Sequence, residues 1–175
     1  MTGADDRVPA TPDELFARLR ELGIETTTVN HPPVFTVEQS KALRGPVPGC
    51  HTKNLFLRNK KGCMWLVVCL ESRVVNLKAL GRSIGTGPLS FGSPERLMRY
   101  LGVIPGAVTP FAVINDSGCA VGVVLDRAIL DQEPLNFHPL DNAMTTSIGA
   151  ADLLRFLAAE EHPPVLVDLD GIATE

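Results

Sequence analysis

The chain has 175 residues, of which 45% are hydrophobic and 21% are charged, a composition typical of a globular protein and not of a disordered or fibrous one. Its longest apolar run, Met64–Leu70, is too short to cross a bilayer, and Asp5 and Asp6 stand where a signal peptide would carry positive charge. We therefore expect a cytoplasmic protein with a flexible N-terminus over residues 1–10 and one domain over residues 11–175.

The net charge of −4 is unevenly distributed along the chain. The segment from Lys41 to Arg82 holds nine Lys or Arg and a single acid, Glu71, so it carries +8 and the remainder carries −12. Its basic residues are Lys41, Arg44, Lys53, Arg58, Lys60, Lys61, Arg73, Lys78 and Arg82. This asymmetry is typical of a surface that attracts a polyanion such as nucleic acid. The alternative is that folding scatters these charges over separate solvated loops.

The first elements have clear start and stop signals. Thr11–Glu14 combines a helix N-cap, a proline at the first helical position and a capping-box glutamate, and Gly23 is suited to end the helix. Ile24–Val29 is rich in threonine and β-branched residues, which predicts a strand. His31–Pro33 breaks regular structure, and a second capping pattern predicts a short helix over Thr36–Leu43.

The middle of the chain predicts two strands and two helices. Lys53–Arg58 and Cys63–Leu70 read as strands joined by the turn Asn59–Gly62. A short helix is expected near Asn76–Leu80. A serine and a proline then cap a second helix over Ser93–Leu101, with a glycine directly after it.

The last third predicts a hairpin, a helix and a final strand. Phe111–Ile114 and Cys119–Leu125 are expected to pair as the hairpin. A helix is expected over Ala150–Glu160, followed by a strand over Val165–Asp168. Hairpins and isolated helices without a regular strand–helix alternation predict an α+β fold with a mixed sheet.

No motif of a common enzyme class occurs in the chain. It lacks a GxSxG elbow, a P-loop, an HExxH pair and a Rossmann glycine fingerprint. The four histidines have no acidic or cysteine neighbours at ligand spacing, so we expect no metal site, and the four cysteines are expected to be reduced thiols. Cys50 and His51 could act as nucleophile and base, although adjacent residues on an extended chain point apart.

Three segments carry candidate chemistry. Lys53 opens an apolar strand, where an amine can hold a phosphate or polarise a carbonyl, or can simply protect a strand edge from aggregation. The rigid loop Gly102–Pro110 contains Gly106, which could offer an N–H to a ligand oxygen or only connect two elements. His138 precedes Pro139, which fixes its direction, and it could exchange a proton or be a structural histidine.

These segments together resemble the YbaK/prolyl-tRNA synthetase insertion-domain family of editing hydrolases. The matching features are Lys53–Leu57, Gly85–Glu95, Gly106–Pro110, Asn115, Asp116 and Phe137–Leu140, followed by Asn142 and Thr145. The similarity extends over about residues 11–168 and is specific in the order and spacing of the motifs. Within the family, the free-standing length and the Phe137–Leu140 segment are most similar to ProXp-ala, a group of prolyl-tRNA deacylases that clears alanine.

The resemblance implies a mixed, mostly antiparallel and partly barrel-like sheet flanked by helices, and a site without metal or other cofactor. It assigns catalytic roles to Lys53, to Gly106 as a ligand of the substrate carbonyl or oxyanion, and to His138 in the amino-acid pocket. Substrate-binding roles extend to Asn54, Thr109, Pro110 and Asn142. The implied partner is the acceptor end of an aminoacylated proline tRNA, with prolyl-tRNA synthetase as a second candidate and no membrane. Without a surrounding synthetase, the chain is expected to act in trans.

Substrate size explains why such a hydrolase is needed. A synthetase pocket built for proline cannot strongly exclude alanine, because missing methylenes are worth only about 1–3 kcal/mol. We therefore expect an enzyme that hydrolyses alanyl-tRNA(Pro) to free alanine and tRNA, by positioning a reactive ester and a water. The alternatives are the same chemistry on cysteine- or serine-charged tRNA, a module that binds aminoacyl-tRNA without cleaving it, or a hydrolase with Cys50 as nucleophile.

Overall fold

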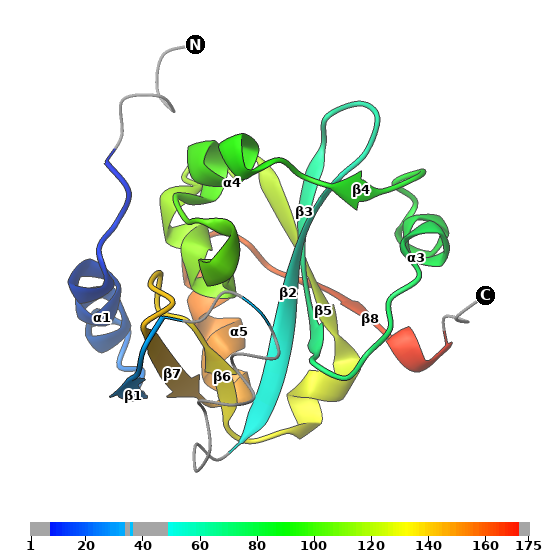
Figure 1. Cartoon of the computed structure of the whole chain (residues 1–175). Coiled ribbons are helices and arrows are strands. Elements are labelled where there is room, and N and C mark those ends of the chain that lie inside the picture. The colour runs from blue at the N-terminus through cyan, green and yellow to red at the C-terminus, as the bar shows by residue number, and fades with distance from the viewer. Residues whose placement is uncertain (1–7, 34–35, 37–48, 172–175) are drawn as a thin grey trace.

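The computed structural model describes residues 8–33, 36 and 49–171, which form an α+β fold with one mixed sheet flanked by helices (Figure 1). Within the described residues the strand order is β1-β7-β6-β2-β3-β5-β8, with β4 paired to β2, and four of the seven pairings are antiparallel. The strands are β1 (Thr27–Asn30), β2 (Cys50–Arg58), β3 (Met64–Leu70), β4 (Ser90–Phe91), β5 (Val121–Asp126), β6 (Leu135–Phe137), β7 (Met144–Ile148) and β8 (Val165–Val167). The predicted fold class is confirmed.

Two helices begin directly after the predicted caps Thr11 and Ser93, whereas the helix predicted near Asn76–Leu80 extends to Ile84. The helices are α1 (Pro12–Glu21), α3 (Leu77–Ile84), α4 (Pro94–Leu101) and α5 (Ala150–Ala159), with the short 3-10 helices η1 (Pro105–Ala107), η2 (Pro110–Asn115), η3 (Arg127–Asp131) and η4 (Leu169–Gly171). At α1 the predicted capping box is formed, with Glu14 N donating to Thr11 Oγ1 at 3.2 Å and Thr11 N to Glu14 Oε1 at 3.0 Å. Within the described residues, no helix is long and apolar enough to cross a membrane.

Strand β2 joins the two halves of the sheet. Its first residues, Cys50 and His51, pair in parallel with β6, whereas Thr52–Arg58 pairs antiparallel with β3. Because successive side chains on a strand point to opposite faces, β2 supplies side chains to two separate cores. The larger core includes Phe56 and lies among α1, α4, η2 and α5, and the smaller core includes Leu57 and lies against α3.

Aromatic side chains hold the larger core together. Phe111 of η2 is fully buried and makes edge-to-face contacts with Phe137 of β6 and Phe156 of α5, at centroid distances of 5.8 and 5.6 Å. Burying a side chain of this size stabilises the fold by about 1.5–3 kcal/mol, and each aromatic pair adds about 0.5–1.5 kcal/mol. These contacts fix β6, whose last residue directly precedes His138, against the helices.

The predicted hairpin of Phe111–Ile114 with Cys119–Leu125 is wrong. The first segment belongs to the 3-10 helix η2, which Thr109 caps and Pro110 opens, and β5 pairs in parallel with β3 and β8. A strand between two parallel neighbours is apolar on both faces, so its run of valines carried no hairpin signal. The predicted strand Ile24–Val29 is displaced to β1, and the helix predicted over Thr36–Leu43 lies outside the described residues except at its first position.

A buried ion pair closes the end of α5 against β5. His162 Nε2 lies 2.9 Å from Asp116 Oδ2, both side chains are almost completely buried, and His162 Nδ1 donates to Glu160 O at 2.6 Å. Asp116 also accepts from the backbone N–H groups of Ala120 and Val121. Burial opposes both charges, yet these hydrogen bonds lower the pKa of Asp116 and raise the pKa of His162 relative to their ordinary values.

We expect His162→Gln to lower the free energy of unfolding by about 3 kcal/mol near pH 6, because it leaves the Asp116 carboxylate buried without its charged partner. The contribution of His162 is complete below its unfolded pKa of about 6.5 and is lost as the pH rises through its higher folded pKa. Urea denaturation across this range should therefore show the two proteins converging at alkaline pH. Glu21→Gln, which removes an exposed i,i+3 partner of Arg18, is the control and should cost less than about 0.5 kcal/mol. A difference independent of pH would contradict a charged His162.

Candidate active site

The register of β2 and β6 fixes the point in the sheet from which His138 follows. Leu135 and Phe137 of β6 are buried in the larger core, and His138 comes directly after the strand. The parallel pair His51 with Asn136 fixes the alignment of β6 against β2. The two predicted catalytic side chains have different partners, since Lys53 Nζ donates to Arg73 O and His138 Nδ1 donates to Met144 O.

Asn136 ties three strands into a rigid support for this site. Its Oδ1 accepts from Ser147 Oγ of β7 at 2.5 Å, and its Nδ2 donates to Cys50 O of β2 at 3.3 Å. Its own carbonyl accepts from Thr52 Oγ1 at 3.1 Å. Because Asn136 is buried, these bonds are shielded from water and hold β7, β6 and β2 in fixed register.

His138 is a neutral imidazole with a defined tautomer. Its Nδ1 lies 2.7 Å from Met144 O, and a carbonyl can only accept, so Nδ1 carries the proton and Nε2 the lone pair. Burial lowers the pKa of His138 most strongly; the Met144 carbonyl opposes this effect, and the neighbouring His31 lowers the pKa further. At neutral pH, Nε2 is therefore able to accept a proton.

His31 is a site residue that the sequence prediction missed. Its ring lies 6.0 Å from the ring of His138, measured between centroids, and its Nε2 is 2.8 Å from Thr145 Oγ1. Its Nδ1 donates to Pro32 O at 2.9 Å, so this imidazole is also fixed in one tautomer. The signal was present in the sequence, because His31 precedes a proline just as His138 does.

Lys53 and Asn54 point to opposite faces of β2. Lys53 lies on the face of Leu57 and the smaller core, and its Nζ donates to the main-chain oxygen of Arg73. Asn54 lies on the face of Phe56, and its Oδ1 is buried without a hydrogen-bond partner among the described residues. A buried acceptor without a donor is uncommon in proteins, so this oxygen is suited to receive one from a ligand.

On the loop after α4, Gly106 is partly exposed, whereas Thr109 and Pro110 are buried. Gly106 is partly exposed in the turn η1, where the first N–H groups have no acceptor within the helix. Thr109 is fully buried and its Oγ1 accepts from Phe111 N at 3.3 Å, and Pro110 is buried beside it. Thr109 and Pro110 therefore shape the loop that presents Gly106. Asn142 is 7% exposed, on the turn between β6 and β7.

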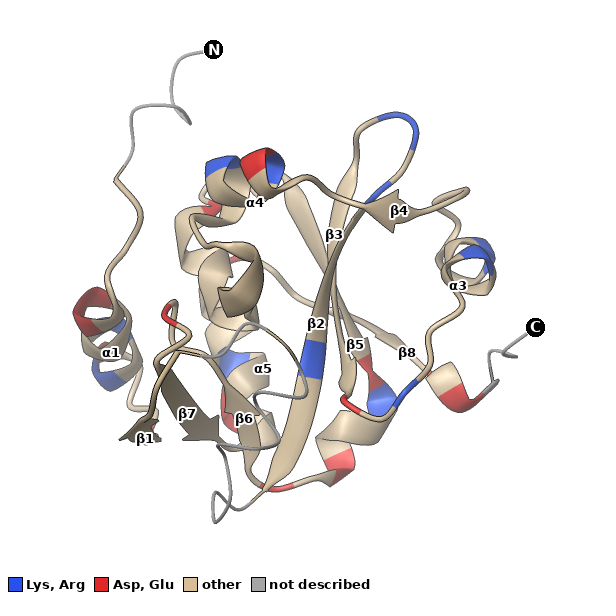
Figure 2. Ribbon diagram, viewed as in Figure 1, with Lys and Arg blue, Asp and Glu red and all other residues tan. Residues whose placement is uncertain are grey.

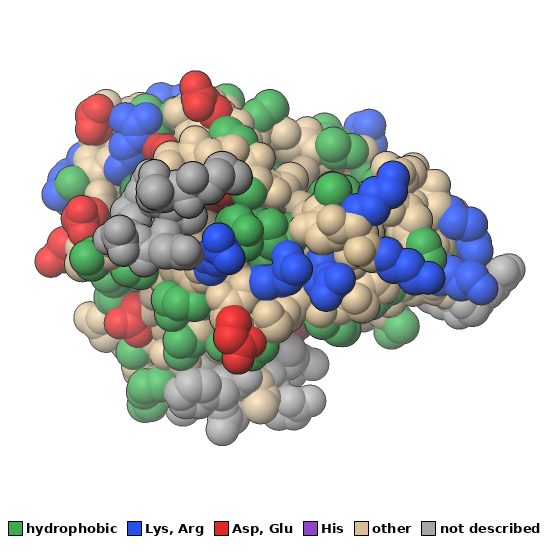
Figure 3. Space-filling model, turned by 90° about the horizontal axis from the view of Figure 1, so that it is seen from above, with side chains coloured by type: hydrophobic (Ala, Val, Ile, Leu, Met, Phe, Trp, Pro, Cys, Tyr) green, Lys and Arg blue, Asp and Glu red, His purple; other side chains and the backbone are tan. Residues whose placement is uncertain are grey.

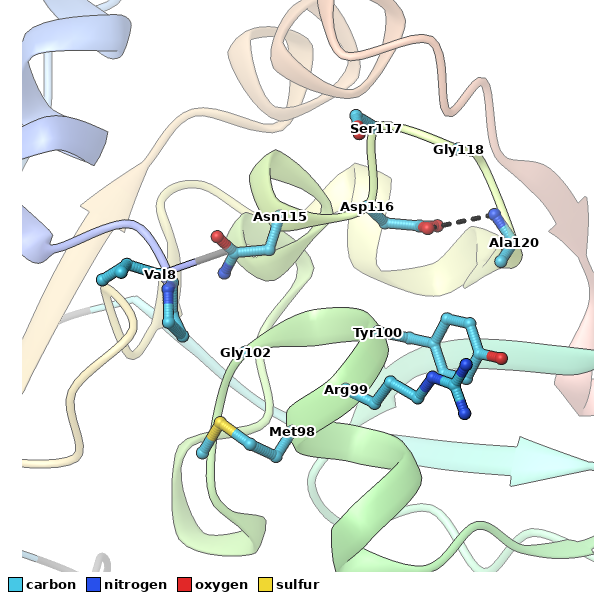
Figure 4. A pocket seen from close by; sticks show the side chains of 11 residues that line it. Val8, Met98, Arg99, Tyr100, Gly102, Asn115, Asp116, Ser117, Gly118 and Ala120 are labelled. Carbon is cyan, nitrogen blue, oxygen red and sulfur yellow. Dashed lines mark hydrogen bonds between the residues drawn. The ribbon is translucent and has the colours of Figure 1, made fainter. Parts of the chain in front are cut away.

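Two cavities lie elsewhere on the described part of the molecule and contain none of the predicted catalytic residues. One, of about 250 Å³, lies between the end of α4 and the turn after η2, beside Tyr100 and Asn115 (Figure 4). Its polar lining is already in use, since Asn115 accepts from Ala10 N and donates to Leu101 O. The other, of about 790 Å³, is an open groove beside α1 and β1. In the described ranges, no three His, Cys, Asp or Glu side chains gather as metal ligands would.

Cys50 is poorly suited to be a nucleophile. It is half-buried, and its Sγ contacts the main-chain oxygen of His51 at 3.8 Å. Burial raises the pKa of the thiol, and the charges of Asp126 and Glu71 raise it further. A thiol with a raised pKa is protonated at neutral pH, whereas the thiolate is the nucleophile.

The basic residues of the Lys41–Arg82 window do not all reach one surface. Lys53 and Arg73 are engaged inside the fold, and Lys41 and Arg44 lie outside the described residues. The remaining cations of the window lie on the hairpin between β2 and β3 and on α3, and α4 adds two more (Figure 2). Figure 3 shows a row of basic side chains across the face seen from above. We call this set the basic strip: Arg58, Lys60, Lys61, Lys78, Arg82, Arg96 and Arg99. The three elements contain one acid, Glu95.

Fold and site together define a small α+β domain with a lysine on β2, a neutral histidine directly after β6 and a basic strip. Residues 31–156 match the family model described as an aminoacyl-tRNA editing domain, and the chain belongs to this family. It is 39% identical over 162 residues to prolyl-tRNA synthetase associated domain-containing protein 1 of Mus musculus, covering 90% of this chain and 95% of the relative.

A second relative agrees with this assignment, and a solved structure shares the fold. The prolyl-tRNA editing protein ProX of Acetoanaerobium sticklandii is 38% identical over 156 residues, covering 89% of this chain and 95% of that protein. A crystal structure described as a proposed trans-editing enzyme for prolyl tRNA synthetase has the same fold, with a TM-score of 0.67 at 18% identity. The structural similarity covers 91% of this chain and 96% of the chain in that crystal structure.

We expect His31→Gln to raise the pKa of His138, because it removes a neighbouring group that can become positively charged while an amide can still bond to Thr145. The pKa should remain below the ordinary histidine value, since burial is unchanged. Titration of the ring nitrogens by NMR measures this shift, with His162 as the internal control. A pKa of His138 that stays constant or falls would rule out the interaction between the two rings.

Proposed function

We propose that the chain is a trans-acting hydrolase that removes alanine from mischarged proline tRNA, yielding free alanine and intact tRNA. The observation that carries this proposal is a neutral His138, held by Met144 O beside His31, in a member of the aminoacyl-tRNA editing family. ProX is named a prolyl-tRNA editing protein, and its similarity to the chain covers 89% of the chain and 95% of ProX, which supports proline tRNA as the RNA.

In the proposed reaction, water attacks the carbonyl carbon of the aminoacyl ester and the bond to the ribose oxygen breaks. His138 Nε2 orients the attacking water and accepts its proton, which then passes to the leaving ribose oxygen. The Gly106 N–H and the Lys53 ammonium stabilise the negative charge that develops on the carbonyl oxygen or on the adjoining terminal nucleotide. One such donor contributes about 2.7–4 kcal/mol to stabilisation of the transition state.

Selection of alanine over proline is proposed to rest on exclusion by size. A pocket closed around a methyl side chain excludes the larger ring of proline sterically. The synthetase pocket, which is large enough for proline, cannot exclude the smaller alanine in this way. The same chemistry on serine- or cysteine-charged tRNA is the nearest alternative, because both side chains are close to alanine in size.

The basic strip is proposed to hold the acceptor stem through its phosphates. Lys60 and Lys61 are exposed on the turn between β2 and β3, and Lys78 and Arg82 are exposed on α3. Basic side chains form a row on the face seen in Figure 3. Contacts to phosphates position a nucleic acid without reading its sequence, so the strip supplies affinity and not the choice of amino acid.

We expect the wild-type protein to release alanine from alanyl-tRNA(Pro) faster than serine, cysteine or proline from the matched substrates. Lys53→Ala should lower kcat/KM by about 100-fold, the effect of losing one transition-state donor. The measurement is single-turnover release of labelled amino acid from each charged tRNA, with both proline and alanine tRNAs. Arg127→Ala, an exposed change on η3, is the matched control. Equal rates for wild type and Lys53→Ala would remove the lysine from the reaction, and an ester left intact by the wild type would favour a binding module.

We expect Lys60→Ala combined with Lys61→Ala to weaken binding of uncharged proline tRNA and to make it less sensitive to salt. Each lost phosphate contact lowers the slope of log K against log salt by about 0.7–0.9. Binding titrations at several salt concentrations measure this slope, again with Arg127→Ala as control. An unchanged slope would place the RNA on another face.

A further inference from the structure

Arg73 is held rigidly although it lies on the loop between β3 and α3. Its N–H donates to Leu70 O at 3.0 Å, and its guanidinium Nε donates to Asp126 Oδ2 at 2.8 Å. A second guanidinium nitrogen, Nη1, donates to Asp170 of η4. The Arg73 side chain is 17% exposed and that of Asp126 is completely buried, so the ion pair is shielded from solvent. These contacts fix the position of the Arg73 main chain.

The Arg73 main-chain oxygen accepts the hydrogen bond from Lys53 Nζ. Within the described ranges the structure gives this amine no other acceptor. The neighbouring residue on β3 is Cys69, whose burial raises its pKa to about 11, so its thiol is neutral and offers Lys53 no countercharge. An ammonium has three N–H groups, and the bond to Arg73 uses one of them. The direction of this single bond therefore sets where the other two N–H groups point.

We propose that Arg73 and Asp126 are positioning residues that aim the Lys53 ammonium at the substrate. This inference rests on the proposed function for the role of Lys53. Asp126 binds the Arg73 guanidinium and thereby fixes the loop between β3 and α3. The Arg73 carbonyl oxygen on this loop then accepts a hydrogen bond from the Lys53 ammonium. A buried ion pair is by itself weak support for stability, because apolar replacements of similar size are often as stable. In this protein, the ion pair between Arg73 and Asp126 fixes the Arg73 carbonyl oxygen next to Lys53, in the middle of β2.

The contact can be tested without any activity by measuring how fast Lys53 is acetylated. Mass spectrometry after brief treatment with an acetyl N-hydroxysuccinimide ester compares Lys53 with the exposed Lys60 in the same sample. Asp126→Asn keeps an oxygen for its bond to Ala128 N but removes the charge that holds Arg73, so acetylation of Lys53 should rise several-fold relative to Lys60. Asp152→Asn, on the exposed ion pair with Arg155, is the matched control and should change nothing.

A double-mutant cycle with deacylation of alanyl-tRNA(Pro) tests the role in catalysis. Asp126→Asn should lower kcat by about tenfold with little change in KM, because a small misplacement of a catalytic group is costly. In a Lys53→Met background the same substitution should have no further effect, whereas a general structural defect would lower the residual rate again. Arg73→Lys, which keeps the charge but cannot bind both carboxylates with one planar group, should give the same pattern if Asp126→Asn fails to fold.

Unchanged acetylation of Lys53, or additive losses in the cycle, would overturn the positioning role. If the wild type itself shows no deacylation, the proposed function fails, and the acetylation experiment alone decides whether Arg73 and Asp126 hold the amine. A rise in Lys53 acetylation with an unaltered kcat would also overturn the proposal, since the amine would then be held without consequence for the reaction.

Discussion

Strand β2 has to satisfy two neighbours of opposite direction, and the positions of Lys53 and Asn54 follow from how it does so. Its first two residues run parallel to β6, and the rest runs antiparallel to β3. The alternation of side chains along β2 then assigns Lys53 to the face of the smaller core and Asn54 to the face of the larger core. A slip of one residue against β3 would exchange these two faces and remove the lysine from its place beside the Arg73 main-chain oxygen.

The helix ends and the central hairpin could be predicted from the sequence because their signals are local. Thr11, Asn76 and Ser93 each cap a helix with a side-chain oxygen, and Gly102 ends α4 in the left-handed conformation. Segments whose structure depends on distant partners could not be predicted in this way. The apolar residues of η2 are buried on all sides, so they show no periodicity, and β6 has only three residues, too few to show alternation.

The same difference between local signals and distant contacts separates the site residues that could be predicted from those that could not. Lys53, Gly106 and His138 were predicted from motifs, and the structure places Lys53 on β2, His138 directly after β6 and Gly106 on a turn after α4. Arg73 and Asp126 carried no signal, because their contact joins residues 53 positions apart and neither belongs to a motif. Only the folded chain shows that the turn after β3 comes back to the middle of β2, and that the buried carboxylate at the end of β5 holds it there.

The smaller core has a consequence for the last part of the chain. Val167 of β8 and Leu169 of η4 are buried in it together with Leu57 of β2, so the C-terminal segment covers the face of the strand that carries Lys53. Shortening the protein before β8 would therefore expose apolar side chains and let water reach the support of a lysine far away in sequence. The tail belongs to the working part of the molecule, even though it lies away from the motifs by which the family is recognised.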